Sequence, residues 1–255
     1  MISKSKLKYL HSLELKKNRD ALGVFVAEGP KVVGDILSCH RSKVCLIVAT
    51  DKWIDSNREL LDTAHCEVVS VSDAELSKAS FLCHPQQVVA VFQKFGDNTP
   101  KEPLEEKLIL ALDGVQDPGN LGTIIRIADW FGIEHIVCSE DTVDVYNPKV
   151  VQATMGSIAR VSVSYTSLDA FLSSLPHGMP IYGTLLEGDN MYHSQLANKG
   201  VVVMGNEGNG ISPAIRQRIT NAIRIPNYPE GRDTAESLNV AVATAIVCAE
   251  FRRLK

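Results

Sequence analysis

Short apolar runs of strand type recur along the whole chain, and segments of helical character separate most of them. The runs cover residues 24–28, 45–50, 67–72, 86–95, 108–113, 135–139, 159–165, 180–186, 201–204 and 222–226. Strands that alternate with helices form mainly parallel sheets, because the connecting helices cover both faces of the sheet. The pattern therefore predicts an α/β fold with a mainly parallel sheet.

The chain is expected to form two domains joined by a linker. Its 255 residues are 45% hydrophobic and 22% charged, which provides enough apolar material for more than one core. Residues 97–105 are polar, include two prolines and lack periodicity, which is typical of a linker. We therefore predict a small α/β domain over residues 1–96 and a second domain over residues 106–255.

Composition disfavours several classes of protein. The six cysteines are scattered without a C-x-x-C pair, and their spacing to histidines fits no zinc module, so we expect no metal. The N-terminus has no apolar signal segment, and no apolar run approaches the length of a membrane span. These features predict a cytoplasmic protein with reduced thiols and no membrane contact.

The first twenty residues are basic, although the chain as a whole has a net charge of −4. Leucines at helical spacing predict a helix there, with a cationic face. Its candidate nucleic-acid contacts are Lys6, Lys8, Lys16, Lys17 and Arg19. A face of this kind either stays solvated or binds phosphates, and this stretch alone does not separate the two possibilities.

A glycine-rich loop from Gly205 to Gly210 follows the apolar run at residues 201–204. Its order, G-x-x-G-x-G, differs from the dinucleotide fingerprint, and no lysine follows as in a phosphate-binding loop. Ligands of open α/β sheets bind at the carboxyl ends of the strands, so a ligand is expected at this loop. Asn206 and Glu207 would supply its side-chain chemistry; the alternative is an ordinary glycine-rich turn.

Polar residues stand at the starts of two expected helices. Asn120 is expected to cap a helix in which Arg126 lies between apolar neighbours. Arg126 either reaches back toward Asn120, or extends to solvent or pairs with Asp129. Ser237 is a candidate cap of the last helix, and Asn239 is then an ordinary residue of its first turn.

Together these segments resemble the three motifs of the SpoU/TrmH family of RNA ribose 2′-O-methyltransferases, within the SPOUT superfamily. The motifs are N-x-G-x-x-x-R from Asn120, V-M-G-N-E-G-x-G ending at Gly210, and I-P at Ile225 with S-L-N-V from Ser237. The resemblance covers the whole second domain. The first block, with its basic helix and the segment F-V-A-E-G-P-K-V-V, resembles the small substrate-binding domain often fused to this family. One departure is the segment at residues 227–237, which is longer than the usual connection.

The resemblance implies a SPOUT-like fold with a C-terminal trefoil knot, which patterns alone would disfavour because knots are rare. It also implies a homodimer in which residues from both subunits meet at each site. S-adenosylmethionine would be held largely by backbone groups. The implied cofactor-binding positions are Thr184, Leu185, Gly205, Asn206, Gly208, Ile225, Pro226 and Leu238.

The implied reaction transfers a methyl group to a ribose 2′-hydroxyl of RNA, with ribosomal RNA favoured over transfer RNA. The family assigns deprotonation to the arginine matching Arg126, but arginine holds its proton too firmly to be an efficient base. Arg126 would more readily clamp RNA phosphate and stabilise the developing oxyanion, which makes Glu207 a competing base. Asn120, Ser237 and Asn239 would orient the reacting groups. The alternatives are an RNA-binding protein without catalysis and a nucleotide-dependent oxidoreductase, which the glycine spacing disfavours.

Overall fold

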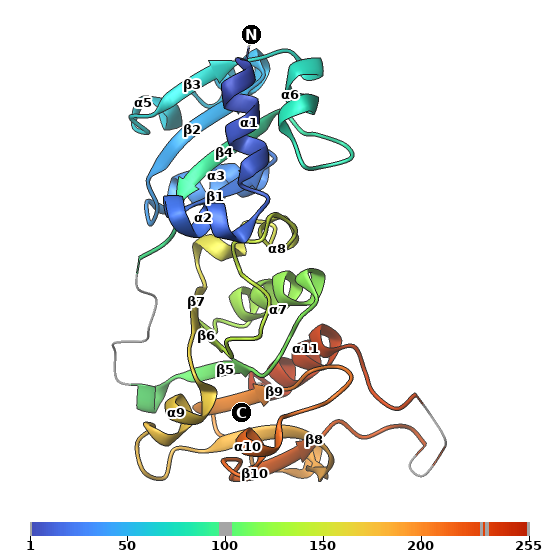
Figure 1. Ribbon diagram of the computed structural model, residues 1–255. Helices are drawn as coiled ribbons and strands as arrows, with labels where there is room; N and C mark the ends of the chain where they lie inside the picture. The colour runs from blue at the N-terminus through green and yellow to red at the C-terminus, as the bar shows by residue number, and fades with distance from the viewer. Residues whose placement is uncertain (1, 97–103, 230–231, 233–234, 254–255) are drawn as a thin grey trace. The chain divides into compact units, whose positions relative to one another are not determined.

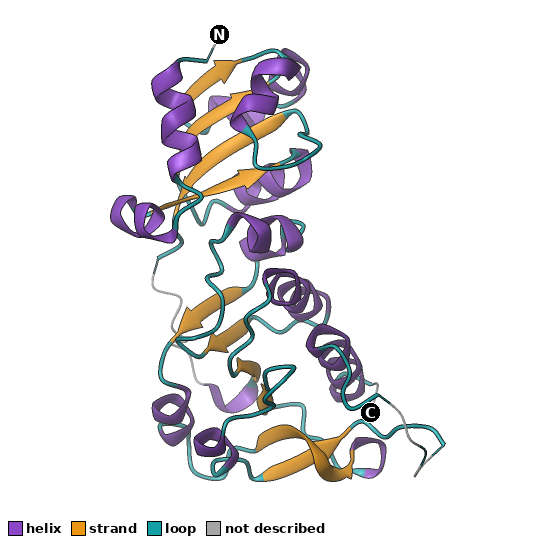
Figure 2. Cartoon of the chain, turned by 45° about the vertical axis from the view of Figure 1, so that its right-hand side comes forward, coloured by secondary structure: helices purple, strands orange, loops and turns teal. Residues whose placement is uncertain are grey.

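The computed structural model describes residues 2–96, 104–229, 232 and 235–253. The chain divides into two compact units, each built around its own sheet (Figures 1 and 2). Unit 1 comprises residues 1–97 and 144–160, and unit 2 comprises residues 98–143 and 161–255. Residues 144–160 thus pack with the N-terminal block. The division into a substrate-binding domain that ends at residue 96 and a second domain that begins at residue 106 stays a prediction. Most of the expected linker, residues 97–103, lies outside the described residues.

The described part of unit 1 contains a four-stranded sheet in the order β1-β4-β2-β3. β4 runs antiparallel to both β1 and β2, whereas β2 and β3 are parallel. The strands predicted here are confirmed to within a few residues. They are β1 (Val24–Glu28), β2 (Val44–Ala49), β3 (Glu67–Ser70) and β4 (Val88–Gln93).

Helices flank this sheet, and the basic N-terminal segment forms two of them instead of the expected one. Fully buried Leu13 follows the first helix, and Leu15 is extended, so the chain turns between the two helices. The helices of unit 1 are α1 (Lys4–Ser12), α2 (Lys16–Leu22), α3 (Pro30–Cys39), α4 (Asp51–Ser56), α5 (Arg58–Asp62), α6 (Asp73–Ala79), α8 (Pro148–Ala153) and the 3-10 turn η2 (Ser157–Ala159).

A buried ion pair and aromatic packing hold residues 144–160 in unit 1. Arg19 is 1% exposed, and its guanidinium donates to two carbonyls of the turn after α1 and, at 2.6 Å, to Asp144 Oδ2. The ring of Tyr146 lies 4.9 Å from that of Phe25, and burial raises the pKa of its phenol to about 12. The expectation that Arg19 contacts RNA is therefore corrected, because its guanidinium is buried and paired with Asp144.

The described part of unit 2 contains a six-stranded, fully parallel sheet in the order β10-β8-β9-β5-β6-β7. Every residue of β5 and β9 is buried, which explains why these strands read as unbroken apolar runs. The parallel sheet predicted from the sequence is confirmed. Its strands are β5 (Leu108–Leu112), β6 (His135–Cys138), β7 (Ser162–Tyr165), β8 (Ile181–Asn190), β9 (Gly200–Met204) and β10 (Asn221–Arg224).

Two long helices of unit 2 lie side by side and run in the same direction (Figure 1). Asn239, at the start of the last helix, bonds to Asn120 in the first turn of the other. Arg252, just past the end of the last helix, donates to the carbonyls of Phe131 and Gly132 beyond the end of the other. The two N-termini therefore share one end of the unit. The helices are η1 (Leu104–Glu106), α7 (Pro118–Trp130), α9 (Leu168–Ser173), η3 (Met191–His193), α10 (Pro213–Arg216) and α11 (Val240–Phe251).

Along the ranges that the structure describes, no helix combines the length and apolarity needed to cross a membrane.

Candidate active site

The glycine-rich loop after β9 is held in one shape by hydrogen bonds. The backbone of Asn206 pairs with that of Gly210, and its side-chain amide donates to the carbonyl of Gly114 at 2.7 Å. Asn206 Oδ1 accepts the backbone N–H of Gly208 at 2.9 Å. A Cβ at Gly205 would lie 2.4 Å from the carbonyl carbon of Gly210. Gly205 is thus required by the loop itself, so replacing it would disturb the loop as well as any ligand.

Asp113, which our sequence analysis did not single out, holds the other end of this loop. The residue is 9% exposed, and its carboxylate accepts the backbone N–H of Ser212 at 2.7 Å. Because Asp113 directly follows β5, it lies where the neighbouring strand β9 enters the loop. A carboxylate immediately after a buried strand was the signal that could have identified it.

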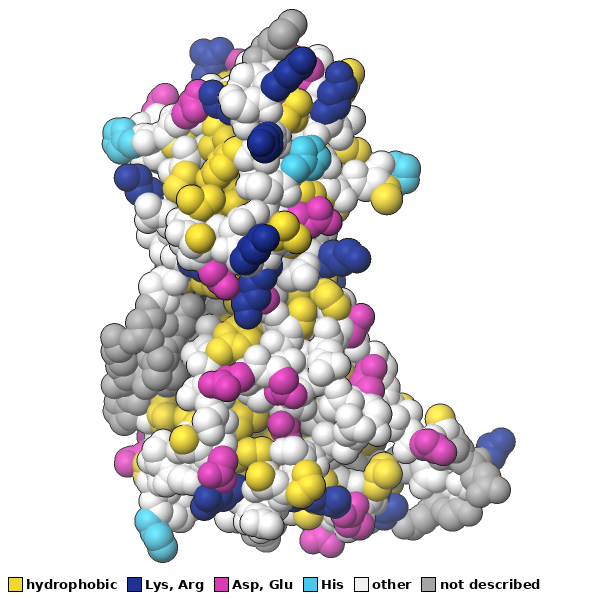
Figure 3. Space-filling view, in the orientation of Figure 1, with side chains coloured by type: hydrophobic (Ala, Val, Ile, Leu, Met, Phe, Trp, Pro, Cys, Tyr) yellow, Lys and Arg dark blue, Asp and Glu magenta, His cyan; other side chains and the backbone are white. Residues whose placement is uncertain are grey.

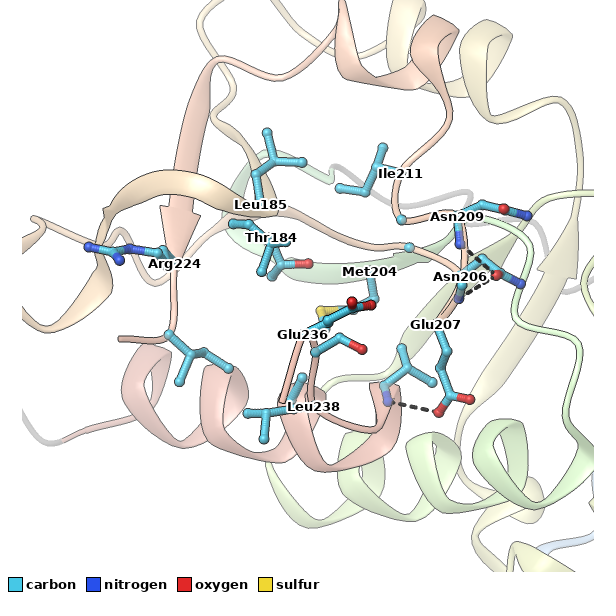
Figure 4. Close-up of a pocket in the computed structure, with 18 of the residues that line it drawn as sticks. Thr184, Leu185, Met204, Asn206, Glu207, Asn209, Ile211, Arg224, Glu236 and Leu238 are labelled. Carbon is cyan, nitrogen blue, oxygen red and sulfur yellow. Dashed lines mark hydrogen bonds between the residues drawn. The ribbon is translucent and has the colours of Figure 1, made fainter. Parts of the chain in front are cut away.

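The loop forms one wall of a pocket of about 380 Å³ at the carboxyl end of the sheet (Figure 4). The other walls come from β8, the end of β10 and the segment that leads into α11. Pro226 does not line the pocket among the described residues, although its neighbour does. Seven of the eight positions expected to hold the cofactor line it: Thr184, Leu185, Gly205, Asn206, Gly208, Ile225 and Leu238.

Sequence reasoning missed several side chains of this pocket. Two of them lie on β8 and β10, whose parallel pairing is irregular and shifts register between Ala222 and Ile223. The others come from the end of β9, from α10 and from the segment before α11. Periodicity gives no sign of such a shift. For one of them a weak signal existed, since Glu236 directly precedes the S-L-N motif. The missed side chains are those of Glu187, Met204, Arg216, Arg224 and Glu236.

Three of the predicted catalytic residues meet beside the pocket. The side-chain amide of Asn120 donates to Glu207 Oε1 at 2.9 Å. That of Asn239 donates to the same oxygen at 2.7 Å and to Asn120 Oδ1 at 2.9 Å. The backbone N–H of Val240 also donates to Glu207 Oε1, at 3.1 Å (Figure 4). One carboxylate oxygen therefore organises two amide side chains and the first turn of α11.

The caps of the two helices differ from those expected. Asp117 caps α7 by accepting the backbone N–H of Asn120 at 2.8 Å, which leaves the Asn120 side chain for the contacts with Glu207. Asn239 caps α11 by accepting two backbone N–H groups, so Ser237 is not the cap. Ser237 is exposed and lines the pocket instead. The first turn of α11 thus presents its positive end to the Glu207 carboxylate through the backbone N–H of Val240, whereas α7 reaches it through the Asn120 side chain.

Arg126 is not part of this cluster within one chain. Its side chain is exposed and forms no hydrogen bond or ion pair with any described residue, so neither the contact with Asn120 nor the pair with Asp129 is found. Arg126 follows Asn120 by six positions along α7, which places the two side chains on different faces of the helix. Arg126 is thus available to a partner outside its own chain.

The buried thiols of unit 2 have no contact with this chemistry. Burial raises the pKa of the Cys248 thiol to about 12 and that of Cys138 further still, so both behave as inert core groups. Within the described ranges, no three His, Cys, Asp or Glu residues are grouped so as to hold a metal ion.

Comparison with known proteins identifies the family. Residues 107–249 match the SpoU rRNA methylase family, and residues 4–90 match the MRM3-like substrate-binding domain. The chain is 31% identical to the Bacillus subtilis 23S rRNA (guanosine(2553)-2′-O)-methyltransferase RlmP over 250 residues, covering 97% of this chain and 96% of that protein. This chain belongs to the SpoU rRNA methylase family.

Solved structures agree with this assignment. A TrmH-family protein from Porphyromonas gingivalis is 40% identical, with a TM-score of 0.87 and 99% coverage of each chain. An rRNA methyltransferase from Sinorhizobium meliloti with bound S-adenosylmethionine is 31% identical, with a TM-score of 0.87 over 99% of this chain and 97% of that one. The predicted family and fold class are confirmed, whereas the knot follows from neither strand order nor pairing and stays a prediction.

Proposed function

We propose that this protein transfers the methyl group of S-adenosylmethionine to a ribose 2′-hydroxyl of ribosomal RNA. The observation that carries the proposal is the Asn120–Glu207–Asn239 cluster at the edge of a pocket built from loops of a SpoU-family domain. A protein that only bound RNA would need neither the pocket nor the organised carboxylate beside it. The relative from Bacillus subtilis is named for the same reaction on 23S rRNA.

The pocket fits the cofactor in size and in lining. Its volume of about 380 Å³ lies within the range of small-molecule sites. Backbone groups of the loop from Gly205 to Gly210 and apolar side chains such as Leu185 and Leu238 would hold the cofactor. When bound, S-adenosylmethionine supplies an electrophilic methyl group on a positively charged sulfur.

The polar cluster suits the stabilisation of a negative oxygen. The N-termini of α7 and α11 meet there, and helix N-termini attract anions such as phosphate or a developing oxyanion. Arg126, exposed and without a partner among the described residues, would clamp the RNA phosphate and the 2′-oxygen with its planar fork of donors. Glu207 would then act mainly by orienting the Asn120 and Asn239 amides.

The proposed homodimer rests on the outer face of the helix pair. Trp130 at the end of α7 is 86% exposed and Val242 on α11 is 50% exposed. The outward positions of α11 continue with Ala245, Ile246 and Ala249, which carry no charge. A face of this kind is typical of a subunit interface. Such a dimer would supply Arg126 from a second subunit, which accounts for its isolation from the cluster.

The dimer can be tested by placing a charge on this face. Val242→Asp should shift the molar mass from dimer to monomer in size-exclusion chromatography with light scattering, because the carboxylate would be buried unpaired. Asn198→Asp, which adds the same charge at an exposed position of the same unit, is the matched control. A wild-type protein that is monomeric at high concentration would contradict the dimer.

The reaction is tested directly by incubating the protein with labelled S-adenosylmethionine and either 23S rRNA or transfer RNA. Label should enter 23S rRNA at a nucleotide whose 3′ phosphodiester becomes resistant to alkali, the signature of a 2′-O-methyl group. Label in transfer RNA alone would change the substrate but leave the chemistry. Binding of RNA without transfer of label would refute the enzymatic function.

Glu207→Gln separates orientation from proton transfer. Glutamine keeps an oxygen that can accept from Asn120, Asn239 and Val240, so an orienting Glu207 predicts at most about a tenfold loss of rate. Single-turnover rates measured across pH provide the test, with Glu207→Ala as the variant that removes the acceptor. A collapse in rate with a flattened pH profile in Glu207→Gln would assign the base role to Glu207.

A further inference from the structure

One carboxylate in the pocket has no partner among the residues that the structure describes. In the described part of the chain, five charged side chains line the pocket. Glu187 and Arg216 form an ion pair with each other, and Glu207 accepts the three hydrogen bonds of the polar cluster. Arg224 also interacts with another part of the protein. Glu236 forms no hydrogen bond or ion pair with any described residue, whereas the other four charged side chains of the pocket all have a partner.

Glu236 lies in the central part of the pocket. Figure 4 shows its carboxylate near Met204, with Arg224 toward one end of the pocket and Glu207 toward the other. The residues on either side of it along the pocket wall, such as Leu238 and Thr184, are uncharged. A ligand that occupies the pocket therefore has its middle section next to an uncompensated negative charge.

The cofactor of the proposed function has a positive charge in its middle section. Sulfur joins the adenosine part to the methionine part and carries a permanent charge in S-adenosylmethionine. The product, S-adenosylhomocysteine, has the same two ends, including the same amino and carboxylate groups, but its sulfur is a neutral thioether. The two molecules therefore differ in a methyl group and in the charge that an adjacent carboxylate would detect.

We propose that Glu236 is the residue by which this protein distinguishes the sulfonium cofactor from its thioether product. The proposal rests on the proposed function and concerns the same pocket. The Glu236 carboxylate stabilises the positively charged sulfur and has no such attraction for the neutral one. The spent cofactor is thus held less tightly than the fresh one, which favours exchange after each turnover.

The expected size of the effect follows from Coulomb attraction. Two unit charges about 4 Å apart attract each other enough in water to change a dissociation constant by about fivefold, and more where protein displaces water. Because Glu236 is exposed in the absence of ligand, we expect a value near the lower limit, about five- to tenfold.

The test measures affinities for both molecules by isothermal titration calorimetry with full-length wild-type protein, Glu236→Gln and Glu187→Gln. In Glu236→Gln, the dissociation constant for S-adenosylmethionine should rise by about five- to tenfold, while that for S-adenosylhomocysteine should change by less than about twofold. Glu187→Gln is the matched control, because this carboxylate lines the same pocket but is already paired with Arg216. It should leave the ratio of the two constants unchanged.

Two other outcomes are decisive. An equal loss of affinity for both molecules in Glu236→Gln would mean that the carboxylate binds the shared amino group or shapes the loop, and would overturn the proposal. Wild-type protein that binds neither molecule would instead refute the proposed function. If Glu236→Gln is poorly folded, the wild type still provides a test, because its preference for S-adenosylmethionine should narrow as salt rises. A preference that does not change with salt would also overturn the proposal.

Discussion

The two units differ in charge and in the way their functional segments are held. Unit 1 carries 15 Lys and Arg residues against 13 Asp and Glu, whereas unit 2 carries 11 against 17. Lys and Arg side chains gather over α1 and α2 on the face shown in Figure 3. The attraction of RNA phosphates is therefore expected from unit 1, since the net charge of unit 2 opposes it. In unit 2 the proposed contact with phosphate is local and rests on the exposed side chain of Arg126.

The supporting contacts differ in the same way. In unit 1 a side-chain ion pair, Arg19 with Asp144, ties two distant parts of the chain together. In unit 2 the pocket loop is fixed by the backbone pairing of Asn206 with Gly210 and by hydrogen bonds of the Asn206 and Asp113 side chains, without an ion pair between distant segments among the described residues. Charge-altering substitutions should thus affect the stability of unit 1 and the rate of chemistry in unit 2. A fragment beginning near Glu105 would not separate these effects, because it would retain Asp144 without Arg19.

The largest expected effect comes from breaking the buried ion pair. Arg19→Met should lower the free energy of unfolding by about 3–5 kcal/mol, because it leaves the Asp144 carboxylate buried without its partner. Urea unfolding monitored by circular dichroism gives the value. Lys17→Met, on the same helix but exposed, should change it by less than about 0.5 kcal/mol. A loss below about 1 kcal/mol in Arg19→Met would contradict the structural role of the pair.

Arg126 tests the chemistry of unit 2 without altering its fold. Arg126→Lys and Arg126→Ala should both slow methyl transfer by about a hundredfold or more, because a single ammonium cannot replace the planar fork at the reacting oxygen. Single-turnover rates measure the loss, and affinity for S-adenosylmethionine should hardly change. Arg218→Lys is the control, since Arg218 pairs with Asp169 at 2.7 Å on the surface of the same unit. An Arg126→Lys enzyme with a near wild-type rate would remove Arg126 from the catalytic centre.

The exposed lysines of unit 1 test the origin of RNA affinity. The double variant Lys16→Gln, Lys17→Gln should weaken RNA binding by about tenfold at low salt and reduce the salt dependence by about two counterions. Cofactor affinity should not change, because both lysines belong to unit 1. Lys8 is likewise exposed, whereas Lys6 is half-buried and pairs with Glu67 at 2.9 Å, so we expect less from Lys6.

Fluorescence anisotropy with a labelled rRNA fragment, measured over a series of salt concentrations, provides the values for this double variant. Lys199→Gln serves as the control, because Lys199 belongs to unit 2 and pairs with Glu106. RNA affinity that is unchanged in the lysine variant, together with a flat salt response, would place the RNA contacts outside α2.

The smallest effect concerns the pH dependence of unit 1. Glu28 is 6% exposed, and burial raises the pKa of its carboxyl, although hydrogen bonds from Ser80 and the Phe81 N–H act in the opposite direction. The folded state then holds the proton more firmly than the unfolded state, so the contribution of Glu28 to stability is greatest in acid and falls as pH rises through its folded pKa. Glu28→Gln cannot ionise and should gain stability relative to wild type between pH 4 and pH 7, measured by urea unfolding. A difference that stays constant with pH would contradict the assignment.

Part of this protein can be predicted from its residues alone, because local patterns record local physics. Unbroken apolar runs such as residues 108–112 and 200–204 indicate strands buried on both faces, and the structure has parallel strands there. The order of glycines from Gly205 to Gly210 excluded a dinucleotide loop and indicated a ligand site, and a pocket lies there. The family could also be identified from the three short motifs, because their residues and spacing can be read directly from the sequence without knowledge of the fold.

The tertiary structure alone decided which side chains meet. Asn120, Glu207 and Asn239 are far apart in the chain and share hydrogen bonds because β5 and β9 are neighbours and α7 and α11 start at the same end of unit 2. In the sequence Arg19 resembles the other cations of the basic segment, and only the structure shows that it pairs with Asp144. Likewise, only the structure places Glu236 in a pocket. Periodicity reports whether a residue is buried in its own helix or strand. Strand order and helix packing determine its partners, and these depend on contacts between residues distant in sequence.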